Sequence, residues 1–139
     1  MKLSTRGKYG LYAMYYLAAH AGEGPLPLQS ISTMGGVPKQ YLEQLLGNLR
    51  RAGLVSTVRG AQGGYQIAAA PENVTLRDII DAVEGPIELS ECASADNTSG
   101  TCPVRWVWQH VTDSINSELE KIKLSDMLTQ ACESEEEQP

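Results

Sequence analysis

The chain has 139 residues, of which 42% are apolar, and these values suit one modest domain plus an accessory element. No apolar stretch approaches the roughly 18 residues that a membrane-spanning helix needs, and Met1–Lys8 is too polar for a signal peptide. Three cysteines without a secretion signal favour a reducing compartment, so we expect a cytoplasmic protein without a membrane partner.

The formal net charge of −6 is divided unevenly along the chain. Residues 1–69 carry seven basic and two acidic side chains, a net charge of +5, whereas residues 70–139 carry four basic and fifteen acidic ones. Affinity for a polyanion depends on the local potential rather than on the total charge. The first half is therefore the half that we expect to face nucleic acid.

Three helices are predicted in the first half. The first runs from Ser4 to about Ala21, with an apolar face formed by Tyr9, Tyr12, Ala13, Tyr16 and Leu17. A short helix over 28–33 and a glycine turn lead to a third helix over 38–52, which Gly53 closes. The apolar positions that point inward on this third helix are Tyr41, Leu42, Leu45, Leu46 and Leu49.

A β-hairpin and a fourth helix follow. Two short segments, 54–58 and 65–69, flank a glycine-bearing loop and are typical of paired strands. Thr75–Asp78 resembles a capping arrangement, with Asp in place of the usual Glu or Gln, and opens a helix to about Glu84. The expected fold is mostly α with a small β wing: a winged helix-turn-helix domain over residues 1–86 and a long C-terminal dimerisation helix.

The remaining residues predict a sensor loop, that long helix and a tail. Residues 87–102 form a polar loop that bears cysteines, and the segment 103–132 opens with a long helix to about Lys123. The acidic stretch 133–139 is expected to be disordered. The long helix carries one apolar stripe, formed by Val104, Val107, Trp108, Val111, Ile115, Leu119 and Ile122.

This stripe is too extensive to leave in water on a monomer of this size. Burial of its side chains at roughly 1.5–3 kcal/mol each would contribute on the order of 10–20 kcal/mol before entropy. We therefore predict a homodimer through this helix. The alternative is a helix that packs on its own chain alone. A two-fold dimer would place two DNA-reading helices about one duplex turn apart, or a multiple of one.

The order helix, short helix, turn, helix and hairpin predicts that the third helix enters the DNA major groove. Its outward side chains can read guanine, adenine and cytosine edges, and they are Lys39, Gln40, Glu43 and Gln44. Tyr41 is expected either to reach a phosphate or to pack. Glycines in the wing let the backbone approach phosphates, although any hairpin turn needs glycines. The remaining predicted DNA contacts are Lys2, Lys8, Arg50, Arg51, Arg59 and Gly60.

Several segments in fixed order resemble the IscR/CymR/NsrR family of bacterial regulators. They cover the chain to about Leu128 and are Met1–Gly10, Tyr41–Leu45, Leu49–Val55, Val58–Tyr65, Asp78–Ile80 and Glu84–Pro86. The resemblance implies a winged-helix dimer on imperfect palindromic promoter DNA, with Glu43 and Gln44 contacting bases and Arg59 in the wing. It also implies control of iron–sulfur, cysteine or redox-stress genes, and we expect a repressor.

The signal stays open at this level. Cluster-binding members of the family carry three loop cysteines and a fourth ligand, whereas this chain offers Cys92 and Cys102. Arg105 stands at the position of the ligating histidine, and Lys8 at that of an acidic ligand, and neither can ligate iron. Four interpretations follow: a 2Fe-2S cluster completed by the partner subunit, a thiol switch, plain free thiols, or control by a partner protein such as a cysteine-biosynthesis enzyme.

Two other classes of function compete with DNA binding. His20 and His110 lack metal-ligand spacing and no nucleophile stands beside an oriented base, so we expect no enzyme activity. The alternative is a protein-interaction adaptor that uses the winged helix without binding DNA. The basic charge of the first half favours DNA over that adaptor.

Overall fold

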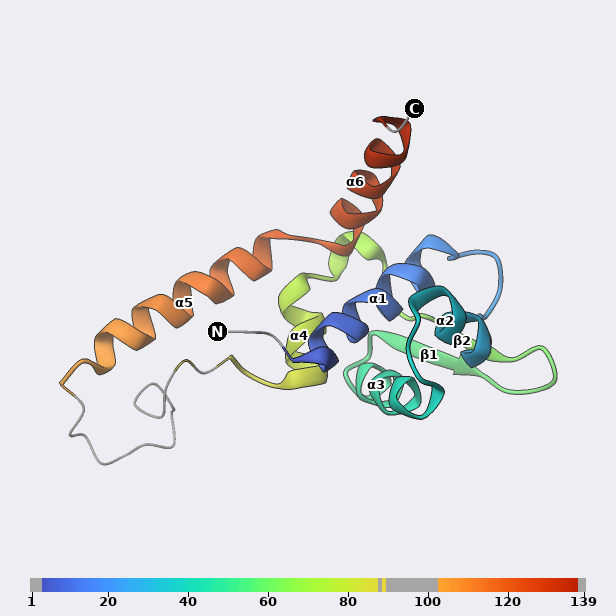
Figure 1. The fold of residues 1–139 in the computed structure, drawn as a ribbon, viewed down its shortest axis with the longest axis horizontal. Coiled ribbons are helices and arrows are strands. Elements are labelled where there is room, and N and C mark those ends of the chain that lie inside the picture. The colour runs from blue at the N-terminus through green and yellow to red at the C-terminus, as the bar shows by residue number, and fades with distance from the viewer. Residues whose placement is uncertain (1–3, 88, 90–102, 138–139) are drawn as a thin grey trace.

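The computed structural model describes residues 4–87, 89 and 103–137, with side chains as far as Gln130. The predicted mostly helical fold with a small β wing is confirmed. No helix in the described ranges is long and apolar enough to cross a membrane. In chain order the elements are α1 (Thr5–Ala19), α2 (Leu28–Gly35), α3 (Lys39–Arg51), β1 (Val55–Val58), β2 (Gly64–Ile67), η1 (Pro71–Asn73), α4 (Leu76–Glu84), α5 (Arg105–Lys121) and α6 (Leu124–Glu137) (Figure 1).

The hydrophobic core lies where α1, α3 and α4 meet, and α2 and the start of α6 add to it. The inward leucines of α3 are buried as predicted, because their spacing of three and four residues puts them on one helix face. The largest fully buried side chains are Met14, Ile31, Leu42, Leu45, Leu46, Leu49, Ile79, Ile80, Leu124 and Val74.

The buried face of α1 differs from the predicted one. Ala13 and Leu17 are buried, but Tyr12 is 38% exposed, and the other buried positions are Gly7, Gly10, Met14 and Ala18. A Cβ atom on Gly10 would lie 2.9 Å from Cγ1 of Val83, so this glycine permits the close approach of α4. A hydropathy pattern counts tyrosine as apolar and overlooks a face that needs small side chains.

The β-hairpin is shorter than predicted and has a third partner. β1 and β2 are antiparallel, with Val55 opposite Ile67 and Val58 opposite Gly64. Leu26, between α1 and α2, exchanges two backbone hydrogen bonds of 2.8 Å with Tyr65. The wing is therefore tied along its second edge to the segment that leads into the helix-turn-helix.

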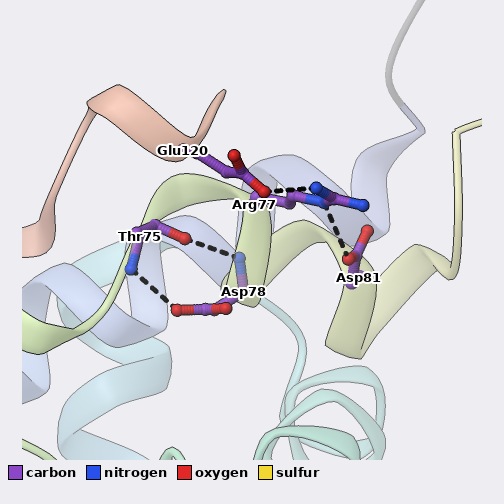
Figure 2. A network of polar contacts seen from close by, with 5 residues as sticks. All are labelled: Thr75, Arg77, Asp78, Asp81 and Glu120. Atoms are coloured by element: carbon purple, nitrogen blue, oxygen red, sulfur yellow. Dashed lines mark hydrogen bonds and ion pairs between the residues drawn. The ribbon is translucent and has the colours of Figure 1, made fainter. Parts of the chain in front are cut away.

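Helix α4 begins with the predicted capping box. Thr75 Oγ1 accepts a hydrogen bond from the Asp78 N–H at 3.1 Å, and the Asp78 carboxylate accepts one from the Thr75 N–H at 3.0 Å (Figure 2). Arg77, between them, pairs with Asp81 on α4 and with Glu120 on α5 (Figure 2). The hydrogen bond to Glu120 is the main reason that the pKa of Arg77 is raised.

The backbone reinforces this junction between α4, α5 and α6. The Leu76 N–H donates to the Ile122 carbonyl and the Leu124 N–H donates to the Val74 carbonyl, both at 2.8 Å. The first turn of α4 therefore holds the point where α5 ends and α6 begins.

Helix α5 extends away from the winged-helix body (Figure 1), and none of its residues is buried. Val104 and Ile122 from the predicted stripe are the residues that flank the helix, and they are 47% and 42% exposed. Trp108 and Val111 are exposed as well, whereas Val107, Ile115 and Leu119 are half-buried. The core of one protomer therefore does not cover the stripe.

Helix α6 is longer than the C-terminal helix that the sequence predicts. Leu124 is fully buried, and Met127 and Leu128 pack against the core. The helix continues to Glu137, so the predicted end at Cys132 is wrong and residues 133–137 are helical rather than a disordered tail. Glutamate is a good helix former, and extending an existing helix requires no new nucleus. Charge repulsion alone is therefore a poor guide to this segment.

Candidate DNA interface

Helix α3 presents one apolar and one polar face. Its leucines point into the core, and the side chains on the opposite face line a shallow open concavity. These outer residues follow helical spacing and are Gln40, Glu43, Gln44, Gly47, Asn48 and Arg51. A helix with this division can rest on its own domain and still offer hydrogen-bonding groups to a partner.

Both ends of α3 are well defined. Gly36, with φ of +65°, forms the turn after α2, and Ser32 Oγ donates to the Val37 carbonyl across it. Pro38 is the N-cap rather than the first helical residue. At the other end Gly53, with φ of +80°, donates to the Arg50 carbonyl at 3.0 Å, which confirms the predicted glycine stop.

The four predicted base-reading side chains lie together at the start of α3. Lys39, Gln40, Glu43 and Gln44 are all exposed. Within the described part of the chain, none of them forms a hydrogen bond or ion pair with another residue through its side chain. Their donors and acceptors are therefore available to a ligand on the outer face.

Tyr41 packs against α1. Its ring lies edge-on to the ring of Tyr9, with centroids 5.8 Å apart, and its hydroxyl is 3.2 Å from Thr5 Oγ1. The side chain is half-buried. Of the two roles predicted for Tyr41, this geometry favours packing, and the first turns of α1 and α3 are joined through it.

Exposed basic side chains lie at the end of α3 and on α1. Arg50 and Arg51 are exposed at the end of α3, and the Arg51 guanidinium donates to Asn48 while it lies over Gly47. Lys8 is exposed on α1, and its Nζ lies 5.9 Å and 5.8 Å from the ring centroids of Tyr9 and Tyr12. Lys2, which was also predicted to contact DNA, lies outside the described residues.

The backbone conformation of the hairpin requires the glycines of the wing. Gly60 has φ of +115°, and a Cβ atom on Gly63 would lie 2.1 Å from the Val58 carbonyl oxygen. The need of a hairpin turn therefore accounts for them. Arg59 is exposed at the wing tip and pairs with no other described residue, so it is the cationic group that the wing offers.

Two features near this site were missed from the sequence. Gly47 and Asn48 share the outer face of α3, and counting helical spacing onward from Gln40 would have found them. The contact between Glu84 and the start of α1 joins residues 80 positions apart, and no local pattern indicates it.

The described residues provide no complete set of ligands for a 2Fe-2S cluster. Cys92 and Cys102 lie outside the described residues. Elsewhere in the described ranges, no group of three His, Cys, Asp or Glu side chains could hold a metal ion. Arg105 is the first residue of α5, and Lys8 covers two tyrosine rings. Neither a guanidinium nor an ammonium group is among the thiolate and imidazole ligands that hold such clusters, so these two positions supply no ligand.

Known proteins of similar sequence are transcriptional regulators. The HTH-type transcriptional regulator IscR of Aliivibrio salmonicida is 37% identical over 130 residues, which cover 92% of this chain and 77% of the relative. The HTH-type transcriptional regulator CymR of Bacillus subtilis is 40% identical over 127 residues, which cover 91% of this chain and 89% of the relative.

Solved structures give the same result. IscR of T. potens superposes with a TM-score of 0.78 at 44% identity, covering 94% of this chain and 88% of that one. CymR of B. subtilis, described as the global cysteine regulator, gives 0.77 at 39% identity and covers 94% and 98%. The model of the Rrf2 family, described as iron-dependent transcriptional regulator, matches residues 3–130. The chain is a DNA-binding transcriptional regulator rather than an enzyme, and it belongs to the Rrf2 family.

Proposed function

We propose that this regulator binds imperfect palindromic promoter DNA as a homodimer, with one α3 helix of each protomer in the major groove. The groove is about 12 Å wide and admits a single helix whose N-terminal residues lie nearest the bases. Lys39, Gln40, Glu43 and Gln44 read base edges, and Arg59 contacts the backbone or minor groove beside them. Basic side chains on α1 and at the end of α3, with the Gly60 backbone, contact phosphates.

The outer face of α3 carries this proposal. It combines donors, acceptors and cations on one exposed surface, while the opposite face is sealed into the core. The side chains that line the concavity carry amide, carboxylate and guanidinium groups, which can bond to base edges and phosphates. The centre of a protein-interaction surface is typically enriched in aromatic residues and methionine, whereas the residues on this face are glutamine, glutamate, glycine, asparagine and arginine.

The exposed face of α5 supports its role as the surface for the second copy of the chain. A shallow groove on this helix has an apolar floor and is lined by His110, Val111, Ser114, Ile115, Glu118 and Leu119. It continues the exposed stripe through Trp108 and Ile122. A two-fold contact between two such faces is self-complementary, and it holds two reading helices in the symmetry of a palindrome.

The test begins with a duplex that the wild-type chain selects from a randomised library. Arg59→Ala should bind this duplex more weakly, and the slope of log affinity against log salt should fall by about 1, as expected for one lost phosphate contact. Lys123→Ala is the matched control, because Lys123 is an exposed basic residue just before α6, away from α3 and the wing. If Arg59→Ala and Lys123→Ala both leave affinity and slope unchanged, the wing does not contact DNA.

The proposal for the regulated genes is based on the relatives alone. The family description names iron, and the name of one relative names cysteine. We propose repression of sulfur, cysteine, iron–sulfur or redox-stress genes, with a cysteine-biosynthesis enzyme as a candidate partner. Chromatin immunoprecipitation and sequencing would identify the promoters, and binding sites confined to unrelated genes would contradict the assignment.

We propose that the signal acts without an iron–sulfur cluster, because the two loop cysteines and the described residues do not complete a set of four ligands. Protein purified without oxygen should be colourless and free of iron, and should still bind the selected duplex. A visible charge-transfer spectrum with about two irons per chain would contradict this and would point to ligands from the partner subunit.

A further inference from the structure

The carboxylate of Glu84 closes the N-terminal end of α1. Its Oε1 atom accepts hydrogen bonds from the Ser4 N–H at 2.8 Å, from the Gly7 N–H at 3.2 Å and from the Ser4 hydroxyl. Ser4 is the N-cap residue, but its own side chain makes no capping bond to the helix. Glu84, from the end of α4, caps α1 in its place, and its negative charge meets the positive end of the helix dipole.

The sequence leaves room for this contact. A Cβ atom on Gly7 would lie 3.2 Å from Cδ of Glu84 and 3.3 Å from both carboxylate oxygens. One turn later, Gly10 allows Val83 to approach in the same way. Glycine is unfavourable inside a helix, so two glycines on the side of α1 that faces α4 indicate a role in packing.

The capped turn of α1 also supports the reading end of α3. Thr5 and Tyr9 contact Tyr41, which lies between the predicted base readers Gln40 and Glu43. Arg6 and Lys8, in the same first turn, are exposed. The position of this turn therefore sets where two cations stand relative to the start of α3.

We propose that Glu84 is a positioning residue for DNA binding. Its carboxylate fixes the first turn of α1, so that Arg6, Lys8 and the start of α3 meet the duplex together. The proposal rests on the proposed function of α3 and gives it a further determinant. It also reverses the simple electrostatic expectation, in which removal of an acidic charge strengthens binding to a polyanion.

The first experiment compares Glu84→Ala with Glu72→Ala on the selected duplex, using the full chain. Loss of a capping group should weaken binding by roughly fivefold, the size typical of one lost N-cap. The salt slope should fall by about 1, because the cations on the freed turn lose a fixed phosphate contact. Glu72, exposed in η1, is the control of equal charge, and Glu72→Ala should bind at least as tightly as the wild type.

Two further variants separate position from folding. Gly7→Ala should push the carboxylate away by a few tenths of an ångström. The helix propensity that alanine adds offsets the weaker cap, so weaker binding would come from the displaced first turn rather than from a less stable α1. Its effect and that of Glu84→Ala should not add, because both remove one contact. Glu84→Gln keeps an oxygen acceptor without the charge and should retain part of the affinity.

Amide hydrogen exchange reports on the cap without DNA, and the Gly7 amide should exchange faster in Glu84→Ala. Unchanged affinity and slope in Glu84→Ala, with a normal loss in Arg59→Ala, would refute the positioning role and leave the DNA interface intact. If the wild-type chain selects no duplex, the proposed function fails and the positioning role fails with it, whatever the exchange rate at Gly7.

Discussion

Replacement of Gly64 by alanine tests the unexpected attachment of the wing. A Cβ atom at this position would lie 2.2 Å from the Leu26 carbonyl oxygen, 2.4 Å from the Leu26 carbonyl carbon and 2.8 Å from the Pro27 nitrogen. All three atoms belong to the backbone, so a side-chain rotation cannot relieve the clash. The segment at Leu26 must therefore move away from β2, and the paired hydrogen bonds with Tyr65 are lost.

The expected cost comes from those two bonds. At about 0.5–1.5 kcal/mol each, their loss should lower the free energy of unfolding by roughly 1–3 kcal/mol. For a chain of this size the Tm changes by about 4 °C per kcal/mol, so Gly64→Ala should melt roughly 4–12 °C lower in a circular dichroism scan.

Gly47→Ala is the matched control, since it makes the same chemical change inside a helix. Its Cβ atom would meet nothing closer than the Arg51 guanidinium at 3.7 Å. Alanine there should stabilise the protein by about 0.5–1 kcal/mol, so the two variants should shift the Tm in opposite directions. A Gly64→Ala protein that melts within about 1 °C of the wild type would show that Leu26 does not pair with the wing in solution.

The remaining predictions concern bases, assembly and core. Glu43→Ala should relax base preference in a repeated selection at nearly unchanged affinity for random duplex, and a uniform loss across sequences would give Glu43 a structural role instead. Ile115→Asp should shift the protein toward monomer in sedimentation equilibrium, whereas Ser117→Asp, with the same charge on the opposite face of α5, should stay dimeric. A monomeric wild type would refute the α5 interface. Leu124→Ala should lower stability by about 2–5 kcal/mol in urea unfolding, because the side chain is fully buried. A loss below 1 kcal/mol would mean that α6 is not docked on the core.

Local patterns predicted the elements that depend on local chemistry. The leucines of α3 repeat at helical spacing, the glycines of the wing fit one hairpin, and Thr75 and Asp78 form a box within four residues. The outward residues of α3 followed from the same periodicity. Each of these features is determined by side chains that are neighbours in sequence.

Features that join distant segments were not predictable in this way. Leu26 forms an isolated bridge with Tyr65. A single bridged residue produces no alternation of apolar and polar residues by which a strand could be predicted. The small-residue face of α1 is explained by the proximity of Val83 and Glu84, and a pattern in α1 alone does not reveal them. The sequence left two roles open for Tyr41, a phosphate contact or packing. The choice depends on the neighbouring Tyr9 ring, which comes close only in the folded chain.

The junction at Arg77 has a consequence for operator architecture. The ion pair between Arg77 and Glu120 and the backbone hydrogen bonds beside it help to set the direction in which α5 leaves the winged-helix body. In a two-fold dimer, that direction sets how far apart the two α3 helices stand. We therefore expect the number of base pairs between half-sites to depend on residues that never touch DNA, so that spacing and base preference can diverge separately among related regulators.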